Sequence, residues 1–192
     1  MPSRRLLLRT FALAGCSQTV RPQDGPAPAR SAATGFMIPP GKSRRGEPLM
    51  LRGKEPTTVK VSSADTGGQL VVFETTTSPG DGPGLHRHAA QDEWWYVLSG
   101  EFVFQVGDEK FRVPAGGSVF GPRRIPHSFV SIGNVPGRMI ISFQPAGEME
   151  QFFEEYAKMT TALRTGQQPP PPVDGRFGIY RVGPRVSPTD VK

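Results

Sequence analysis

The chain has 192 residues, of which 36% are hydrophobic, together with 21 prolines and 23 glycines. This composition suits one domain with a core, many turns and flexible ends. The net charge is +6, but the basic residues form no stripe interleaved with aromatics, which argues against nucleic acid as a partner. The single cysteine, Cys16, excludes an intramolecular disulfide, and no stretch is long and apolar enough for a mature membrane-spanning helix.

Residues 1–30 have the features of an export signal. The segment Ser3–Arg9 resembles a twin-arginine motif, and a mildly apolar run and Ala27-Pro28-Ala29 follow it. The favoured prediction is therefore export to the periplasm. Two alternatives remain open: a lipobox at Leu13–Cys16 that would lipidate Cys16, and a basic disordered extension of a cytoplasmic protein.

Residues 31–56 lack a sustained period, which predicts a linker or an arm wrapped on the next domain. From residue 57 to 146 the pattern changes to short β-rich runs separated by turn residues. We expect strands at Thr57–Ser62, Gln69–Thr77, Glu93–Leu98, Glu101–Val106, Lys110–Val113, Ser118–Phe120, Ser128–Ile132 and Arg138–Gln144. Because no helical pattern interrupts these runs, they predict an all-β antiparallel barrel or sandwich.

Between residues 147 and 166 the spacing of the apolar residues becomes that of a helix. The apolar residues that recur at steps of three and four are Met149, Phe152, Phe153, Tyr156, Met159 and Leu163. With Gly166 as a C-cap, this pattern predicts one amphipathic helix packed on the outside of the barrel. Residues 167–192, which begin with a proline-rich run, are expected to form an irregular tail.

All three histidines of the chain stand close to one carboxylate in a pattern typical of a metal site. His86 and His88 are two residues apart, so on a strand they share a face. Glu93 follows shortly, and His127 would come from a later strand. Three imidazoles and a carboxylate suit one divalent transition ion such as Fe, Mn, Co, Ni, Cu or Zn. The alternative is a chance histidine pair on a solvated strand.

These residues also resemble the two motifs of the cupin superfamily. The positions that reproduce the first motif are Gly80, His86, His88, Glu93 and Gly100, and those that match the second are Gly116, Pro122 and His127. Arg124 replaces the motif's glycine, so the turn before His127 is expected to differ or to carry about 1 kcal/mol of strain. Ser131 replaces the motif's asparagine.

The resemblance covers residues 57–146 and implies a single-domain jelly roll whose metal ligands are His86, His88, Glu93 and His127. Through Glu93–Glu101 and Pro145-Ala146-Gly147 the chain is similar to small proteins related to quercetin 2,3-dioxygenases. The resemblance also suggests a homodimer, because cupins often dimerise.

The function expected first is a metal-dependent dioxygenase of a small, possibly phenolic, substrate. Strand alternation places Trp95 on the face of Glu93 and Phe129 on the face of His127, so both are candidates for the substrate pocket; simple core packing is their alternative role. Glu93 would be a ligand that also accepts a substrate proton. Two other functions stay open: a non-redox isomerase or lyase of a sugar or keto acid, and a non-catalytic module that binds a small ligand.

Overall fold

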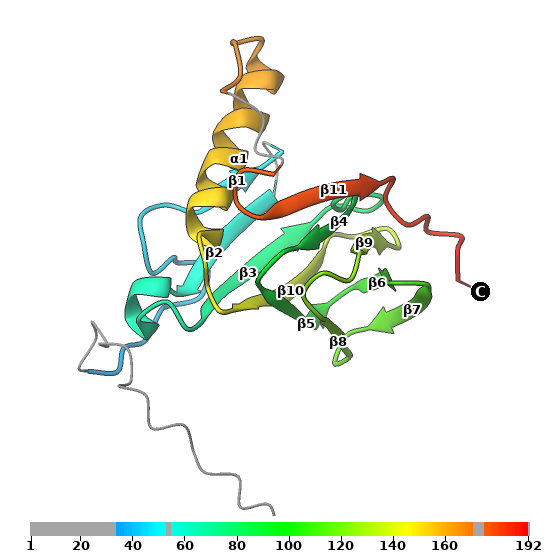
Figure 1. Cartoon of the computed structure of the whole chain (residues 1–192), viewed down its shortest axis with the longest axis horizontal. Coiled ribbons are helices and arrows are strands. Elements are labelled where there is room, and N and C mark those ends of the chain that lie inside the picture. Colours follow the sequence, from blue (N-terminus) through cyan, green and yellow to red (C-terminus); the bar gives the residue numbers. More distant parts are fainter. Residues whose placement is uncertain (1–33, 53–54, 171–174, 192) are drawn as a thin grey trace, which may run out of the picture.

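The computed structural model describes residues 34–52, 55–170 and 175–191. Two antiparallel sheets face each other (Figure 1). In spatial order the first sheet contains β1 (Leu49–Leu51), β2 (Glu55–Val61), β3 (Val71–Thr77), β10 (Gly137–Gln144), β5 (Asp92–Ser99) and β8 (Ser118–Gly121). The second contains β11 (Ile179–Gly183), β4 (Leu85–His88), β9 (His127–Ile132), β6 (Glu101–Val106) and β7 (Glu109–Pro114). The predicted jelly-roll architecture is confirmed.

Strand alternation decides which side chains enter the space between the sheets. On β5, Glu93, Trp95 and Val97 are at most 4% exposed. The residues between them point outward, and Trp94 and Tyr96 are 38% and 37% exposed. A slip of one residue would invert this arrangement, so the core fixes the register of β5. The inward direction of Trp95 expected from the sequence is therefore confirmed.

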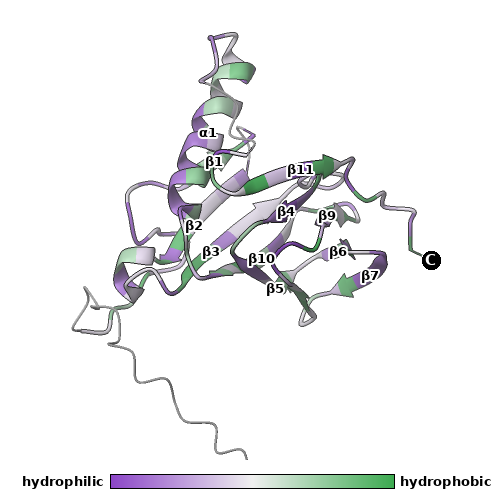
Figure 2. Cartoon of the chain, in the orientation of Figure 1, coloured by the Kyte–Doolittle hydropathy of each residue, from purple (hydrophilic) through white to green (hydrophobic). Residues whose placement is uncertain are grey.

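The helix α1 (Met149–Thr165) follows the last strand of the first sheet. Gly166 adopts φ 70° and its N–H donates to the carbonyl of Ala162, so the expected C-cap is present. Along α1, hydrophobic and hydrophilic bands alternate (Figure 2). The apolar stripe packs against the core, and the backbone N–H of Arg52, just after β1, donates to Thr160 Oγ1 at 3.1 Å. These contacts hold α1 against the edge of the first sheet.

The prediction of a wholly irregular segment after residue 167 is wrong at Ile179–Gly183. These residues form β11, which pairs antiparallel with β4 and places Ile179 opposite His88 and Arg181 opposite His86. Gly175 and Gly178, with φ 76° and 69°, make the turns that precede the strand. The strand forms because it satisfies the open edge of β4.

The segment before residue 57 is more ordered than a linker. It contains β1, which pairs with β2, and β2 itself begins at Glu55 rather than Thr57. The arm preceding β1 is bonded to β2, because the Arg44 N–H donates to the Val59 carbonyl at 2.7 Å. On this arm Met37 is 77% exposed, so it is accessible for the homodimer contacts that remain a prediction.

The predicted export signal, residues 1–30, lies outside the described residues. Within the described part of the chain, no helix has both the length and the apolar character that crossing a membrane requires.

Candidate metal centre

Both sheets contribute to the cluster of histidines and glutamate. His86 and His88 occupy β4, and His127, the first residue of β9, is the direct cross-strand partner of His86. Glu93 comes from β5 in the opposite sheet. The space between the sheets therefore receives imidazoles from one side and a carboxylate from the other.

The four side chains converge on one point. The ring centroid of His86 lies 5.2 Å from that of His88 and 4.7 Å from that of His127. Glu93 Oε2 lies 3.1 Å from His88 Nε2 and 3.0 Å from His127 Nε2. One candidate ligand atom from each residue can be chosen so that all lie within 4.8 Å of one another.

The converging atoms fit a metal ion better than they fit one another. His88, Glu93 and His127 are at most 4% exposed. Although their atoms are close, the contacts lack hydrogen-bond geometry, so His88 Nε2, Glu93 Oε2 and His127 Nε2 have no hydrogen-bond partner. Buried polar atoms are normally satisfied, and a divalent transition ion would satisfy all three together. The cluster could therefore hold a metal ion.

Backbone carbonyls orient two of the imidazoles. His86 Nδ1 lies 2.9 Å from the Gly84 carbonyl and His127 Nδ1 lies 3.0 Å from the Ile125 carbonyl. Because a carbonyl only accepts, each Nδ1 carries the proton and each Nε2 keeps its lone pair. This second layer of hydrogen bonds is the usual way in which metal-binding histidines are held.

Burial and neighbouring groups shift the pKa values of His86 and Glu93. Burial, together with the neighbouring His127, lowers the pKa of His86 to about 3, so its imidazole is neutral and able to ligate at neutral pH. For Glu93, burial acts to raise the pKa, but the nearby His127 and His88 nitrogens outweigh it and the pKa falls below its usual range. Glu93 is thus a carboxylate at neutral pH.

A cavity of about 660 Å³ opens beside the cluster, with His86, His88 and Glu93 in its wall. Phe129, one of the two residues predicted for the substrate pocket, also lines this cavity. Trp95 does not: this residue is 1% exposed and its ring packs edge-on against His127 at 5.2 Å. Trp95 therefore supports a histidine instead of contacting the cavity.

Sequence reasoning missed most of the remaining cavity wall. The apolar stripe of α1 lines the cavity through Met149, Phe152, Phe153, Tyr156 and Met159. The helix thus covers the cavity and is not simply packed on the outside of a closed barrel. Charged residues complete the wall: Arg52, Glu55, Asp81, Arg181 and Arg185. The helical period marked the stripe, but no local signal connected it to the histidines.

Arg124 and Ser131 are the two residues that differ from the second cupin motif. Arg124 keeps the positive φ expected of the replaced glycine, at 69°, so the turn is retained with some strain. Its N–H donates to the His88 carbonyl at 2.7 Å, which ties this turn to β4. Ser131 is buried, and its backbone N–H donates to the Asp81 carbonyl at 2.9 Å. Neither replacement displaces a histidine from the cluster.

Residues 73–143 match the family model described as Cupin domain, and this range contains all four residues of the cluster. The chain therefore contains a cupin domain. It is 34% identical over 61 residues to an uncharacterized protein of Methanocaldococcus jannaschii, a match that covers 32% of this chain and 49% of that relative. It is 27% identical over 108 residues to Protein SchB of Streptomyces halstedii, covering 56% of this chain and 72% of the relative.

Solved structures resemble the chain over about half its length. KdgF from Halomonas sp. aligns with a TM-score of 0.43 and 21% identity, covering 47% of this chain and 78% of that protein. A predicted oxalate decarboxylase from Thermotoga maritima aligns with a TM-score of 0.46 and 23% identity, covering 47% and 80%. These likenesses are too distant to say anything about the reaction of this cupin.

Proposed function

We propose that this cupin is a metal-dependent dioxygenase that acts on a small aromatic substrate, such as a phenol. The observation that carries the proposal is the position of the cluster: His86, His88 and Glu93 form part of the wall of a cavity whose other walls are largely apolar and aromatic. A small organic molecule held there would lie directly beside the candidate metal ligands.

In this proposal His86, His88, Glu93 and His127 hold one divalent transition ion. When bound, the ion would supply the Lewis-acid and redox chemistry that oxygen activation requires. The aromatic wall, which includes Phe129 and Phe143, would orient a flat ring by contact with its faces and edges. Glu93, ionised and pointing into the cavity, would accept the proton of a substrate hydroxyl.

The test combines metal analysis with oxygen uptake. Protein loaded with Fe, Mn, Co or Ni should retain the ion after desalting and consume oxygen when a flavonol or catechol is added. His86→Ala should lose both properties. Arg87→Ala is the matched control, because Arg87 neighbours His86 but its guanidinium stacks on Tyr180 at 4.8 Å. A metal-loaded protein that consumes no oxygen with any phenol contradicts the proposal.

A non-redox isomerase or lyase acting on a sugar or keto acid is the second candidate. The observation that favours it is the charged part of the cavity wall, which contains Arg52, Arg181, Arg185, Glu55 and Asp81. Such an enzyme would convert its substrate under nitrogen as fast as in air. A purely binding protein, the remaining alternative, would retain its ligand unchanged in both atmospheres.

A further inference from the structure

The three histidines of the cluster are not held in the same way. His86 and His127 each place Nδ1 close to a backbone carbonyl, at 2.9 Å from that of Gly84 and 3.0 Å from that of Ile125. In both cases the carbonyl belongs to the residue two positions earlier in the chain. Each ring is therefore fixed at Nδ1, which leaves Nε2 with its lone pair available as the ligand atom.

His88 lacks this support. Its Nδ1 is buried and has no hydrogen-bond partner among the residues that the structure describes. The ring packs against Phe143, with centroids 5.3 Å apart, and the direct cross-strand partner of His88 is Ile179. Neither of these side chains has a polar atom that could bind Nδ1. The outer side of this imidazole is thus positioned by packing instead of a hydrogen bond.

His88 and His127 also differ in their access to the cavity. The two rings are buried and stack on each other, with centroids 5.3 Å apart. His88 forms part of the cavity wall together with Phe143 and Ile179, whereas His127 packs against Trp95 and does not belong to that wall. A donor atom of a molecule in the cavity can therefore approach the place of the His88 ring, but not that of the His127 ring.

The difference in support has an expected size. Loss of the hydrogen bond behind a metal-bound histidine typically costs about 10- to 100-fold in metal affinity. His86 and His127 have this contribution and His88 does not, so less of the metal affinity should depend on His88. Its main chain would stay in place if the ring turned, because the Arg124 N–H donates to the His88 carbonyl at 2.7 Å.

We propose that His88 is the exchangeable ligand of the centre: a donor atom of a molecule in the cavity can take its place while the other three residues keep the ion. The exchange replaces one lone-pair donor with another, so one bond to the ion breaks, another forms, and no electron is transferred. The inference rests on the proposed function for the presence of the ion. It adds that three ligands are permanent and that a substrate replaces the fourth.

The experiment removes each histidine in turn and measures the affinity for Co²⁺ by competition with a chelator. His88→Gly should bind the ion about 10- to 100-fold more tightly than His86→Gly or His127→Gly, because only these two lose an anchored ligand. Imidazole is then added to each variant at saturating cobalt, and the visible spectrum reports the coordination of the ion. It should restore the wild-type spectrum in His88→Gly, where the missing ring opens into the cavity, and not in His127→Gly.

Circular dichroism and thermal denaturation check the fold of the same samples. His88→Gln and His127→Gln, which keep more of the side-chain volume, repeat the comparison of affinities and should give the same order. Equal losses of affinity at the three positions overturn the proposal, as does a His88→Gly spectrum that imidazole leaves unchanged. A wild type that binds no cobalt overturns it as well.

Oxygen uptake by the wild type with a phenol is measured separately. Rescue of His88→Gly by imidazole, without oxygen uptake by the wild type, supports the exchangeable ligand and contradicts the dioxygenase alone. Oxygen uptake together with equal losses at the three histidines contradicts the exchangeable ligand alone.

Discussion

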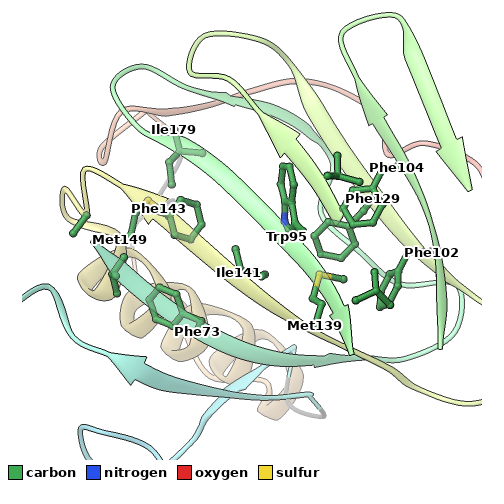
Figure 3. Close-up of a cluster of buried hydrophobic side chains, with 14 of the residues drawn as sticks. Phe73, Trp95, Phe102, Phe104, Phe129, Met139, Ile141, Phe143, Met149 and Ile179 are labelled. Carbon is green, nitrogen blue, oxygen red and sulfur yellow. The ribbon is translucent and has the colours of Figure 1, made fainter. Parts of the chain in front are cut away.

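The space between the two sheets has a packed side and an open side. The packed side, between β5, β6, β8 and β9, is filled by Trp95, Val97, Phe102 and Phe104, each at most 1% exposed. The open side, between β3, β10, β4 and β11, contains the cavity of about 660 Å³ and is covered by α1. Figure 3 shows Phe102, Phe104 and Trp95 grouped apart from Phe73, Phe143 and Met149, which lie near the helix.

The histidine cluster lies where these two sides meet. His127 contacts Trp95 of the packed side, while His86 and His88 line the cavity. Phe129 belongs to both, because its ring lies 5.5 Å from that of Phe104 and it also lines the cavity. One small domain thus combines rigidity with access: tight packing holds some residues of the cluster in place, and the open side leaves a cavity beside them.

The largest expected effect is a cavity created in the packed side. Phe104→Ala removes a ring that contacts Trp95, Phe102 and Phe129. Its loss should lower the free energy of unfolding by about 3–5 kcal/mol, measured by urea denaturation. Phe111→Ala, at a position 41% exposed, should cost at most about 0.5 kcal/mol. Similar costs at the two positions would mean that the packed side is not tightly packed.

The two sides should also respond differently to added volume. Val97→Phe overfills the packed side, where Val97 is fully buried, and should cost about 1–3 kcal/mol. Ile141→Phe places the new ring in the cavity that Ile141 lines. It should preserve stability to within about 1 kcal/mol while weakening binding of an aromatic ligand, as thermal denaturation and calorimetry can show. Equal destabilisation by both variants would remove the distinction between the sides.

Gly121→Ala tests the contact between the packed side and the metal centre. A Cβ at Gly121 would lie 2.8 Å from the Trp95 ring and 3.2 Å from His127 Nδ1. The ring must move and displace His127, so metal affinity should fall by about 10-fold, comparable to loss of a supporting hydrogen bond. Competition with a chelator measures this metal affinity. Gly35→Ala, with no atom near the added methyl, should leave metal affinity unchanged.

The smallest effect concerns a buried carboxyl of the open side. Burial raises the pKa of Glu55 above its ordinary value of 4.5, despite the hydrogen bond from the Ser78 N–H. The folded state then holds this proton more tightly than the unfolded state, so stability falls as pH rises from 4.5 to the folded pKa. Glu55→Gln should remove that fall. The stability of the variant relative to wild type should therefore increase as the pH is raised from 4 to 7.5. The measurement is the midpoint of urea denaturation at each pH. Glu47→Gln, on the exposed arm, is the control.

Much of the fold could be predicted from local patterns. Alternation identified the inward face of β5, and the helical period placed the stripe of α1 with its cap at Gly166. The histidine spacing selected four residues that the fold brings together. These features depend on short repeats, which the sequence displays directly.

The rest depended on contacts between distant segments. Nothing near Arg181 shows that its strand pairs with β4, so β11 and the charged wall were missed. Trp95 and Phe129 each lie two residues from a cluster residue, yet only Phe129 reaches the cavity. An inward direction follows from alternation, but exposure to a cavity depends on the opposite sheet and on α1.

The pairing of β4 has a consequence for how the protein is made. β4 pairs with β9 at a single position, His86 opposite His127, whereas it pairs with β11 at four positions. A growing chain emerges from the ribosome amino end first. The strand with two histidines is therefore synthesised early but gains its main neighbour only when residue 183 has emerged. We expect nascent chains arrested after α1 to capture metal poorly, and those extended past β11 to capture it well.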